Sequence, residues 1–213
     1  MSGWMNPLIG LAMGLNLAAL GTGRLPALIR VAAWQGVVLG IMPLVIESKI
    51  HPLLLLISAA TVGMKGLVIP MLLRRAMRTA NIDRDLDPLI GFLPSLLLGA
   101  AGTIGAVVLA HRLPLLPEHQ ESLLVAGSLA SVFTGLLLLI GRSKAISQVC
   151  GYLILENGIY LFGLLLIHST PLLVEGGILL DLTVAVFVTG IIVDRIQRAF
   201  DTLDTRKLTA LKE

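Results

Sequence analysis

Long apolar runs, separated by short polar joints, follow one another along most of this chain. A helix needs about 20 apolar residues to cross the hydrocarbon layer of a membrane. Seven runs are close to that length, at residues 4–22, 26–46, 53–73, 88–110, 121–141, 146–167 and 172–193. Because the runs are continuous and lack the period-two alternation of membrane strands, the sequence predicts an all-α, polytopic membrane protein with about seven transmembrane helices.

The composition indicates that lipid is the main solvent of the folded chain. Of 213 residues, 56% are hydrophobic and 14% charged, whereas about a quarter of a soluble domain is charged. The formal charge of +3 would suit a nucleic acid, but the basic residues lie between the apolar runs instead of in one patch. We therefore expect a lipid bilayer as partner and no nucleic acid. The single cysteine, Cys150, excludes an internal disulfide, and no metal-ligand spacing of Cys and His exists.

The loop charges predict the orientation of the helices. One set of alternate loops carries most of the basic residues, and the tail after the last run adds more to the same side. The opposite loops carry only Lys49 and Arg112. By the positive-inside rule, the N-terminus is outside and the C-terminus is cytoplasmic, as an odd number of spans requires. The basic residues of the inner loops are Arg24, Arg74, Arg75, Arg78, Arg84, Arg142 and Lys144.

Small residues and prolines predict how the helices pack. Glycines spaced four apart let helix backbones approach closely where hydrophobicity cannot drive association. Two such pairs are Gly10 with Gly14 and Gly36 with Gly40. Prolines inside the apolar runs are predicted to kink the helices that contain them. These prolines are Pro43, Pro70 and Pro94.

Three ionisable residues lie within the apolar runs, away from their ends. Lys65, Glu156 and Asp181 fall near the middle of the third, sixth and seventh runs. A charge at the centre of a membrane helix costs about 2.5 to 3.5 kcal/mol on insertion scales. Such residues usually face the interior of the helix bundle and mark ion or proton paths. All three are therefore candidates for proton translocation.

Polar neighbours support these candidates. Tyr152 and Tyr160 lie four residues before and after Glu156, so they share its helix face. Their hydroxyls are placed to hydrogen-bond the carboxylate or to connect it to water. The predicted supporting residues are Tyr152, Tyr160, Asn157 and Thr61.

The buried charges allow two interpretations. Lys65 pairs with one carboxylate and holds the helices in register, or a carboxyl group gains and loses a proton at mid-membrane. One lysine and two acids leave one acid that is either neutral, since burial favours the neutral form, or paired with another subunit. Whether Lys65 pairs with Glu156, Asp181 or a partner subunit stays open. No Gly-rich phosphate loop and no Ser-His-Asp or Cys-His set is evident, so no catalytic residue, cofactor site or metal site is predicted on this chain.

Two segments resemble a known family. GYLILENGIYL and EGGILLDLTVAVFVTGIIV, within residues 121–194, are similar to the second and third helices of the NuoK-type subunit of respiratory complex I and its MrpC relatives in cation/proton antiporters. In that family each of these helices carries a membrane-embedded carboxylate implicated in proton translocation. The resemblance places Glu156 and Asp181 at those positions, with Asp181 in place of the usual glutamate. It divides the chain into a four-helix segment (1–118), a NuoK/MrpC-like segment (119–194) and a cytoplasmic tail (195–213).

The full length resembles the hydrogenase-4 component E family, through MKGLVIP around Lys65, GYLILENG around Glu156 in the sixth apolar run, and the closing KLTALKE. This resemblance implies a membrane-arm subunit of a complex-I-like, energy-converting [NiFe]-hydrogenase of the formate hydrogenlyase type, in a bacterial or archaeal cytoplasmic membrane. The nickel-iron centre and iron–sulfur clusters would be held by hydrophilic partner subunits, with antiporter-like membrane subunits alongside. This chain would help couple electron transfer to proton or sodium movement. The alternatives are a subunit of a multi-subunit cation/proton antiporter and a structural adaptor between membrane subunits.

Overall fold

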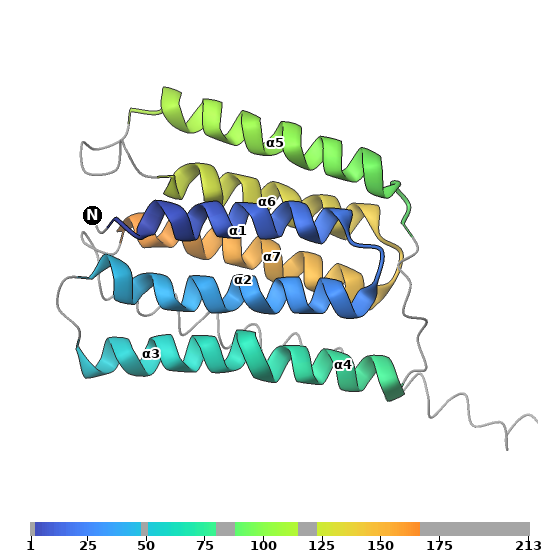
Figure 1. The fold of residues 1–213 in the computed structure, drawn as a ribbon, viewed down its shortest axis with the longest axis horizontal. Coiled ribbons are helices and arrows are strands. Elements are labelled where there is room, and N and C mark those ends of the chain that lie inside the picture. The colour runs from blue at the N-terminus through green and yellow to red at the C-terminus, as the bar shows by residue number, and fades with distance from the viewer. Residues whose placement is uncertain (1–2, 48–50, 80–87, 115–122, 167–213) are drawn as a thin grey trace, which may run out of the picture.

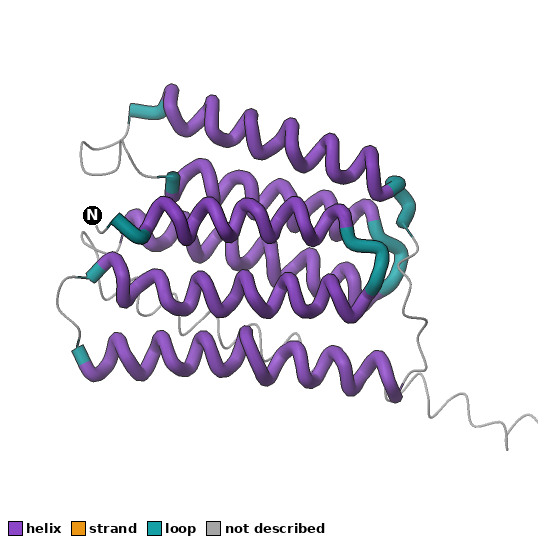
Figure 2. The backbone as a smooth tube through the Cα atoms, viewed as in Figure 1, coloured by secondary structure: helices purple, strands orange, loops and turns teal. Residues whose placement is uncertain are grey.

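The computed structural model describes residues 3–47, 51–79, 88–114 and 123–166, which form helices and loops without a β-strand (Figure 2). A π-helical segment, Met64–Val68, joins α3 to α4, and a 3-10 turn, Leu164–Leu166, follows α7. The α-helices are α1 (Met5–Gly21), α2 (Leu25–Ile46), α3 (Pro52–Gly63), α4 (Ile69–Thr79), α5 (Phe92–Arg112), α6 (Leu124–Gly141) and α7 (Ala145–Gly163). The prediction of an all-α fold is confirmed for these residues.

The helices lie side by side with roughly parallel axes (Figure 1). The continuous helix formed by α3 and α4 lies at one edge of the bundle and α5 at the other. Helix α7 packs against α6 and α2, while α1 packs against α2, α5 and α6. The helices α1, α2, α6 and α7 therefore enclose the core, and residues on their facing sides are withdrawn from the surroundings.

Within the described residues, four helices are long and apolar enough to cross a membrane: Leu25–Ile46, Pro52–Arg78, Phe92–Arg112 and Leu124–Gly141. Met5–Gly21 is a shorter apolar helix. These helices support a helical membrane protein. The seventh predicted run, 172–193, lies outside the described residues, so the full number of spans and their orientation stay predictions.

Two predicted boundaries were wrong. The third apolar run continues as helix to Thr79, so the basic residues Arg74, Arg75 and Arg78 extend α4 instead of lying in a loop. The fourth run begins as helix only at Phe92, which places Pro94 in the first turn of α5. The first backbone N–H groups of a helix have no intrahelical partner, so the ring of Pro94 removes no hydrogen bond there. The predicted kink at this residue therefore has no cause.

The two glycine pairs behave differently. A Cβ atom built on Gly36 would lie 2.6 Å from Cβ of Lys65, and one built on Gly40 would lie 2.7 Å from Val62 Cγ2. This pair therefore allows α2 to approach α3 and the π-helical segment closely, as predicted. Among the described residues, no atom lies within 4 Å of a Cβ built on Gly10 or Gly14. The predicted close approach at α1 is thus not found within this part of the chain.

The closest helix contact involves glycines that the sequence analysis did not assign to packing. Cβ atoms built on Gly135, Gly151 and Gly158 would lie 2.5, 3.0 and 2.6 Å from the backbone nitrogens of Leu155, Leu139 and Val132, respectively. Ser128 Oγ adds a hydrogen bond to the carbonyl oxygen of Gly158, at 2.7 Å. Helices α6 and α7 therefore meet backbone to backbone, which fixes the position of α7 in the bundle.

Arg142 lies in the loop between α6 and α7, as predicted, but its side chain is buried. It follows α6, is only 1% exposed, and donates through Nη1 to the carbonyl oxygen of Ile90 (3.1 Å) and through Nη2 to that of Leu20 (2.8 Å). Its guanidinium carbon lies 4.8 Å from the ring centre of Phe92. Burial lowers the pKa of Arg142, but arginine stays protonated in proteins. The guanidinium thus joins the end of α1 and the start of α5 to the end of α6.

Candidate functional site

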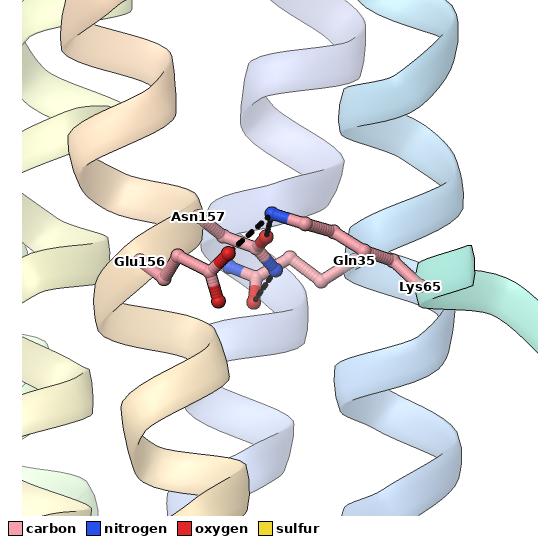
Figure 3. A network of polar contacts seen from close by, with 4 residues as sticks. All are labelled: Gln35, Lys65, Glu156 and Asn157. Atoms are coloured by element: carbon pink, nitrogen blue, oxygen red, sulfur yellow. Dashed lines mark hydrogen bonds and ion pairs between the residues drawn. The ribbon is translucent and has the colours of Figure 1, made fainter. Parts of the chain in front are cut away.

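Lys65 and Glu156 form an ion pair inside the bundle. Lys65 Nζ lies 3.3 Å from Glu156 Oε1, and the two residues are 7% and 4% exposed (Figure 3). Each lies near the middle of its helix, as the sequence predicted. Of the partners that the sequence left open for Lys65, the described residues thus contain Glu156, while Asp181 lies outside them.

The π-helical segment and a glycine place Lys65 in the bundle. In Met64–Val68 the backbone N–H of Ile69 bonds the carbonyl oxygen of Met64, five residues earlier. Pro70 follows directly and has no N–H to offer to an α-helical ladder. Single π-helical turns are rare in proteins, and those that occur often lie at functional sites. Because Gly36 carries no side chain, the backbone of this segment can lie close to α2.

Two further side chains of α7 contact Lys65. Lys65 Nζ donates a hydrogen bond to Asn157 Oδ1 at 3.0 Å. It also lies 5.7 Å from the ring centre of Tyr160, within reach of a cation–π interaction. Tyr160 is therefore beside the pair, as its spacing from Glu156 predicted. Tyr152 is half-buried on α7, and the predicted contacts of the tyrosine hydroxyls with the carboxylate stay predictions.

A chain of hydrogen bonds leads from Asn157 to α6. Asn157 Nδ2 donates to Gln35 Oε1 at 3.3 Å (Figure 3). Gln35 Nε2 donates to Asn16 Oδ1 at 2.7 Å. Asn16 Nδ2 then donates to Ser131 Oγ at 2.9 Å, and Gln35 Nε2 lies 3.5 Å from the same oxygen. All four residues are at most 1% exposed. The polar network therefore joins α1, α2, α6 and α7 to the π-helical segment.

The sequence analysis found only part of this site. Thr61, one of the predicted supporting residues, is buried one turn before Lys65. Asn16, Gln35 and Ser131 were not predicted, because the prediction was limited to ionisable residues and their polar neighbours along the chain. An available signal was the presence of the amides of Asn16 and Gln35 within apolar runs. Polar side chains in membrane helices tend to hydrogen-bond across helices.

The ion pair allows a definite piece of chemistry. A proton that moves from Nζ of Lys65 to the carboxylate of Glu156 converts the ion pair into a neutral amine and acid without changing the net charge. Charge interactions are weakly screened in such surroundings, so a charge arriving nearby would shift the balance between these two forms. The site can therefore hold a proton in one of two places and respond to charge.

These features define a helical membrane protein with a buried lysine–glutamate pair in its interior. The chain is 34% identical over 163 residues to "Hydrogenase-4 component E" of Escherichia coli K12, and this match covers 75% of the chain and 74% of the relative. It therefore belongs to the hydrogenase-4 component E family. An uncharacterized protein of Mycobacterium tuberculosis is 34% identical over 191 residues, covering 89% of this chain and 87% of that protein. No protein-family model and no solved structure matches the chain.

Proposed function

We propose that this chain is a membrane-arm subunit of a complex-I-like, energy-converting [NiFe]-hydrogenase of the formate hydrogenlyase type. It performs no redox chemistry itself and helps couple electron transfer to the translocation of protons or sodium ions. Glu156 and Asp181 serve as protonatable stations, and the charge of Lys65 biases how readily they hold a proton. The complex lies in a bacterial or archaeal cytoplasmic membrane.

The name of the E. coli relative supports the context of this proposal, because it describes that protein as a component of a hydrogenase. In a complex of this kind, hydrophilic partner subunits hold the nickel-iron centre and the iron–sulfur clusters. Antiporter-like membrane subunits lie beside this chain and provide further ion paths. The predicted NuoK-like character of residues 119–194 belongs to the same proposal.

The buried Lys65–Glu156 pair is the observation that carries the coupling role. The pair is nearly withdrawn from the surroundings, and desolvation of two charges can exceed their mutual attraction. Replacing such a pair by apolar residues of similar volume is often neutral or stabilising. Stability alone therefore explains the pair poorly, whereas a proton-holding or charge-sensing role requires ionisable groups at this depth.

The test compares Glu156→Gln with the double variant Lys65→Gln/Glu156→Gln in the assembled complex. The double variant leaves no lone buried charge, so it separates loss of chemistry from the penalty of an unpaired lysine. We expect both variants to retain hydrogen evolution and to lose ion uptake into inverted membrane vesicles. Glu47→Gln, at the end of α2 and outside the polar network, is the matched carboxylate control and should leave ion uptake unchanged.

Two outcomes would contradict the coupling role. Unchanged ion uptake per hydrogen evolved in a fully assembled double variant would show that Glu156 is no station. Failure of the double variant to assemble, with the Glu47→Gln control intact, would favour the structural adaptor. To test the context, the chain is captured from native membranes in mild detergent and its partners identified by mass spectrometry. Antiporter-type subunits without hydrogenase subunits would favour the antiporter alternative.

A further inference from the structure

Three buried amide side chains connect Lys65 to Ser131, and all of them point the same way. In Asn157, Gln35 and Asn16, the carbonyl oxygen accepts from the side nearer Lys65, and the NH₂ group donates toward Ser131. The chain therefore has a direction. It begins at an ammonium group and ends at a hydroxyl oxygen that accepts.

The charge of Lys65 dictates this direction. An ammonium group has three donors and no acceptor, so Asn157 must turn its oxygen toward Lys65. The NH₂ group of Asn157 then faces Gln35, which must present its own oxygen. The NH₂ group of Gln35 in turn faces Asn16, which must also present its oxygen. A neutral amine has a lone pair that can accept, and it would leave the direction of the chain undetermined.

The aligned amides act on Lys65 in return. Each has the negative end of its dipole toward the ammonium group, and hydrogen bonds in a chain polarise one another in a low-dielectric interior. An amide neither gains nor loses a proton under ordinary conditions, so these residues do not themselves relay protons. Their effect is to favour the charged form of Lys65 and to hold its Nζ between Asn157 and Glu156.

We propose that Gln35, Asn16 and Ser131 are positioning residues that act through Asn157 to hold Lys65 as an ammonium ion beside Glu156. Without this chain, the proton passes from Nζ to a carboxylate oxygen, and the pair becomes a neutral amine and acid. The relevance of these residues to ion coupling rests on the proposed function, whereas their effect on the pair does not. The N-terminal helices α1 and α2 thereby set the charge state of a pair that includes α7.

The test is infrared difference spectroscopy of the purified complex in H₂O and D₂O, which detects the C=O band of a protonated carboxyl group. Gln35→Met keeps most of the side-chain length and removes both amide contacts. We expect a new protonated-carboxyl band in Gln35→Met and in Asn16→Leu, with the larger intensity in Gln35→Met because it is nearer the pair. The band should be absent from Gln35→Met/Glu156→Gln, which assigns it to Glu156.

A milder pair of variants covers the case in which these substitutions prevent assembly. Ser131→Ala and Thr134→Ala each remove one fully buried hydroxyl from α6. Within the described residues, Thr134 Oγ1 has no hydrogen-bond partner, so only Ser131→Ala shortens the amide chain. We expect a weak new band in Ser131→Ala and none in Thr134→Ala.

The same carboxyl spectrum in wild type, Gln35→Met and Ser131→Ala, all folded, would overturn the proposal. If Gln35→Met does not assemble, an unchanged spectrum in Ser131→Ala alone would do so. A new band that also persists in Gln35→Met/Glu156→Gln would overturn it too, because the carboxyl group would then not be that of Glu156. Since the spectrum reports the protonation of carboxyl groups and not ion transport, its result is independent of whether Glu156→Gln affects ion uptake.

Discussion

At the scale of single residues, Lys65 and Glu156 are both buried inside the bundle, so both charges are desolvated at a cost in free energy. Their mutual attraction and the hydrogen bond to Asn157 offset part of that cost. Removing one member of such a pair leaves the other as a buried charge without its counter-ion, which is worse than removing both. The pair therefore behaves as a unit in stability as well as in chemistry.

Lys65→Met is accordingly expected to destabilise the protein by about 3–5 kcal/mol, and Lys65→Met/Glu156→Gln by clearly less. Cys150 is the only cysteine and is fully buried, so a thiol-reactive fluorogenic dye reports unfolding of the purified chain on heating in detergent. The melting temperature of Lys65→Met should fall most, and the second substitution should recover part of the loss. A double variant less stable than Lys65→Met would contradict this account.

At the scale of helices, the site depends on glycines that let backbones meet. Gly36 allows the segment carrying Lys65 to approach α2, and Gly158 allows the part of α7 next to Glu156 and Asn157 to approach α6. Small residues have this role in membrane helices because van der Waals packing and hydrogen bonds, not hydrophobicity, hold the helices together. The π-helical segment adds a second effect, since the extra residue in its turn changes the direction in which the side chains of α4 point relative to those of α3.

Gly158→Ala is expected to destabilise the bundle, whereas Gly14→Ala should be neutral or stabilising. The added methyl group at Gly158 would lie 2.6 Å from the backbone nitrogen of Val132, which cannot move independently of α6, and overpacking of this kind costs about 1–3 kcal/mol. At Gly14 nothing among the described residues lies within 4 Å, and alanine favours helix by about 1 kcal/mol. Melting temperatures of the two variants, followed through Cys150, measure the difference. Equal melting temperatures would show that α6 and α7 are not packed in this way.

At the scale of the whole molecule, the described helices have an apolar exterior and a mainly apolar core that encloses the polar network. Helix α5 buries small residues against its neighbours, including Ser95, Gly99 and Ala106. It exposes large apolar residues on its outer side, namely Leu93, Leu97, Leu98, Ile104, Val108 and Leu109. This distribution suits a lipid environment, which lacks the hydrogen-bonding partners that exposed polar groups require. At one end of the bundle, the guanidinium of Arg142 ties three helices through backbone carbonyl groups and an aromatic ring.

The charge pattern of the loops predicts how this molecule lies in the membrane. With the N-terminus outside, the segment between α4 and α5 is cytoplasmic and the segment between α5 and α6 is outside. A fluorescent protein that matures only in the cytoplasm should fluoresce when inserted after residue 83. A phosphatase that folds only outside should be active when inserted after residue 118. The reverse pattern at both positions would mean that the chain is inverted.

Much of the architecture follows from the order of residues alone. The length and apolarity of the runs predict helices, because a chain in lipid must satisfy its backbone hydrogen bonds within each segment. The middle positions of Lys65 and Glu156 mark them as a candidate site, since a charge at that depth has a cost that needs an explanation. The spacing of Tyr160 from Glu156 places it on the same face of α7, because that periodicity is a property of the helix itself. Each of these inferences uses only local information.

Contacts between helices depend on the tertiary structure. Nothing along the chain relates Gln35 to Asn157, which lie 122 residues apart, or shows that Arg142 reaches the end of α1 instead of water. The residue at which a helix begins also depends on neighbouring helices and on prolines near its first turn. Helix α5, for example, begins at Phe92, with Pro94 in its first turn, and not at the start of the apolar run. Which polar side chains meet is set by the rotation and register of each helix. Those are determined by backbone contacts at Gly36, Gly135 and Gly158 and by the π-helical segment at Lys65, and they exist only when the helices pack together.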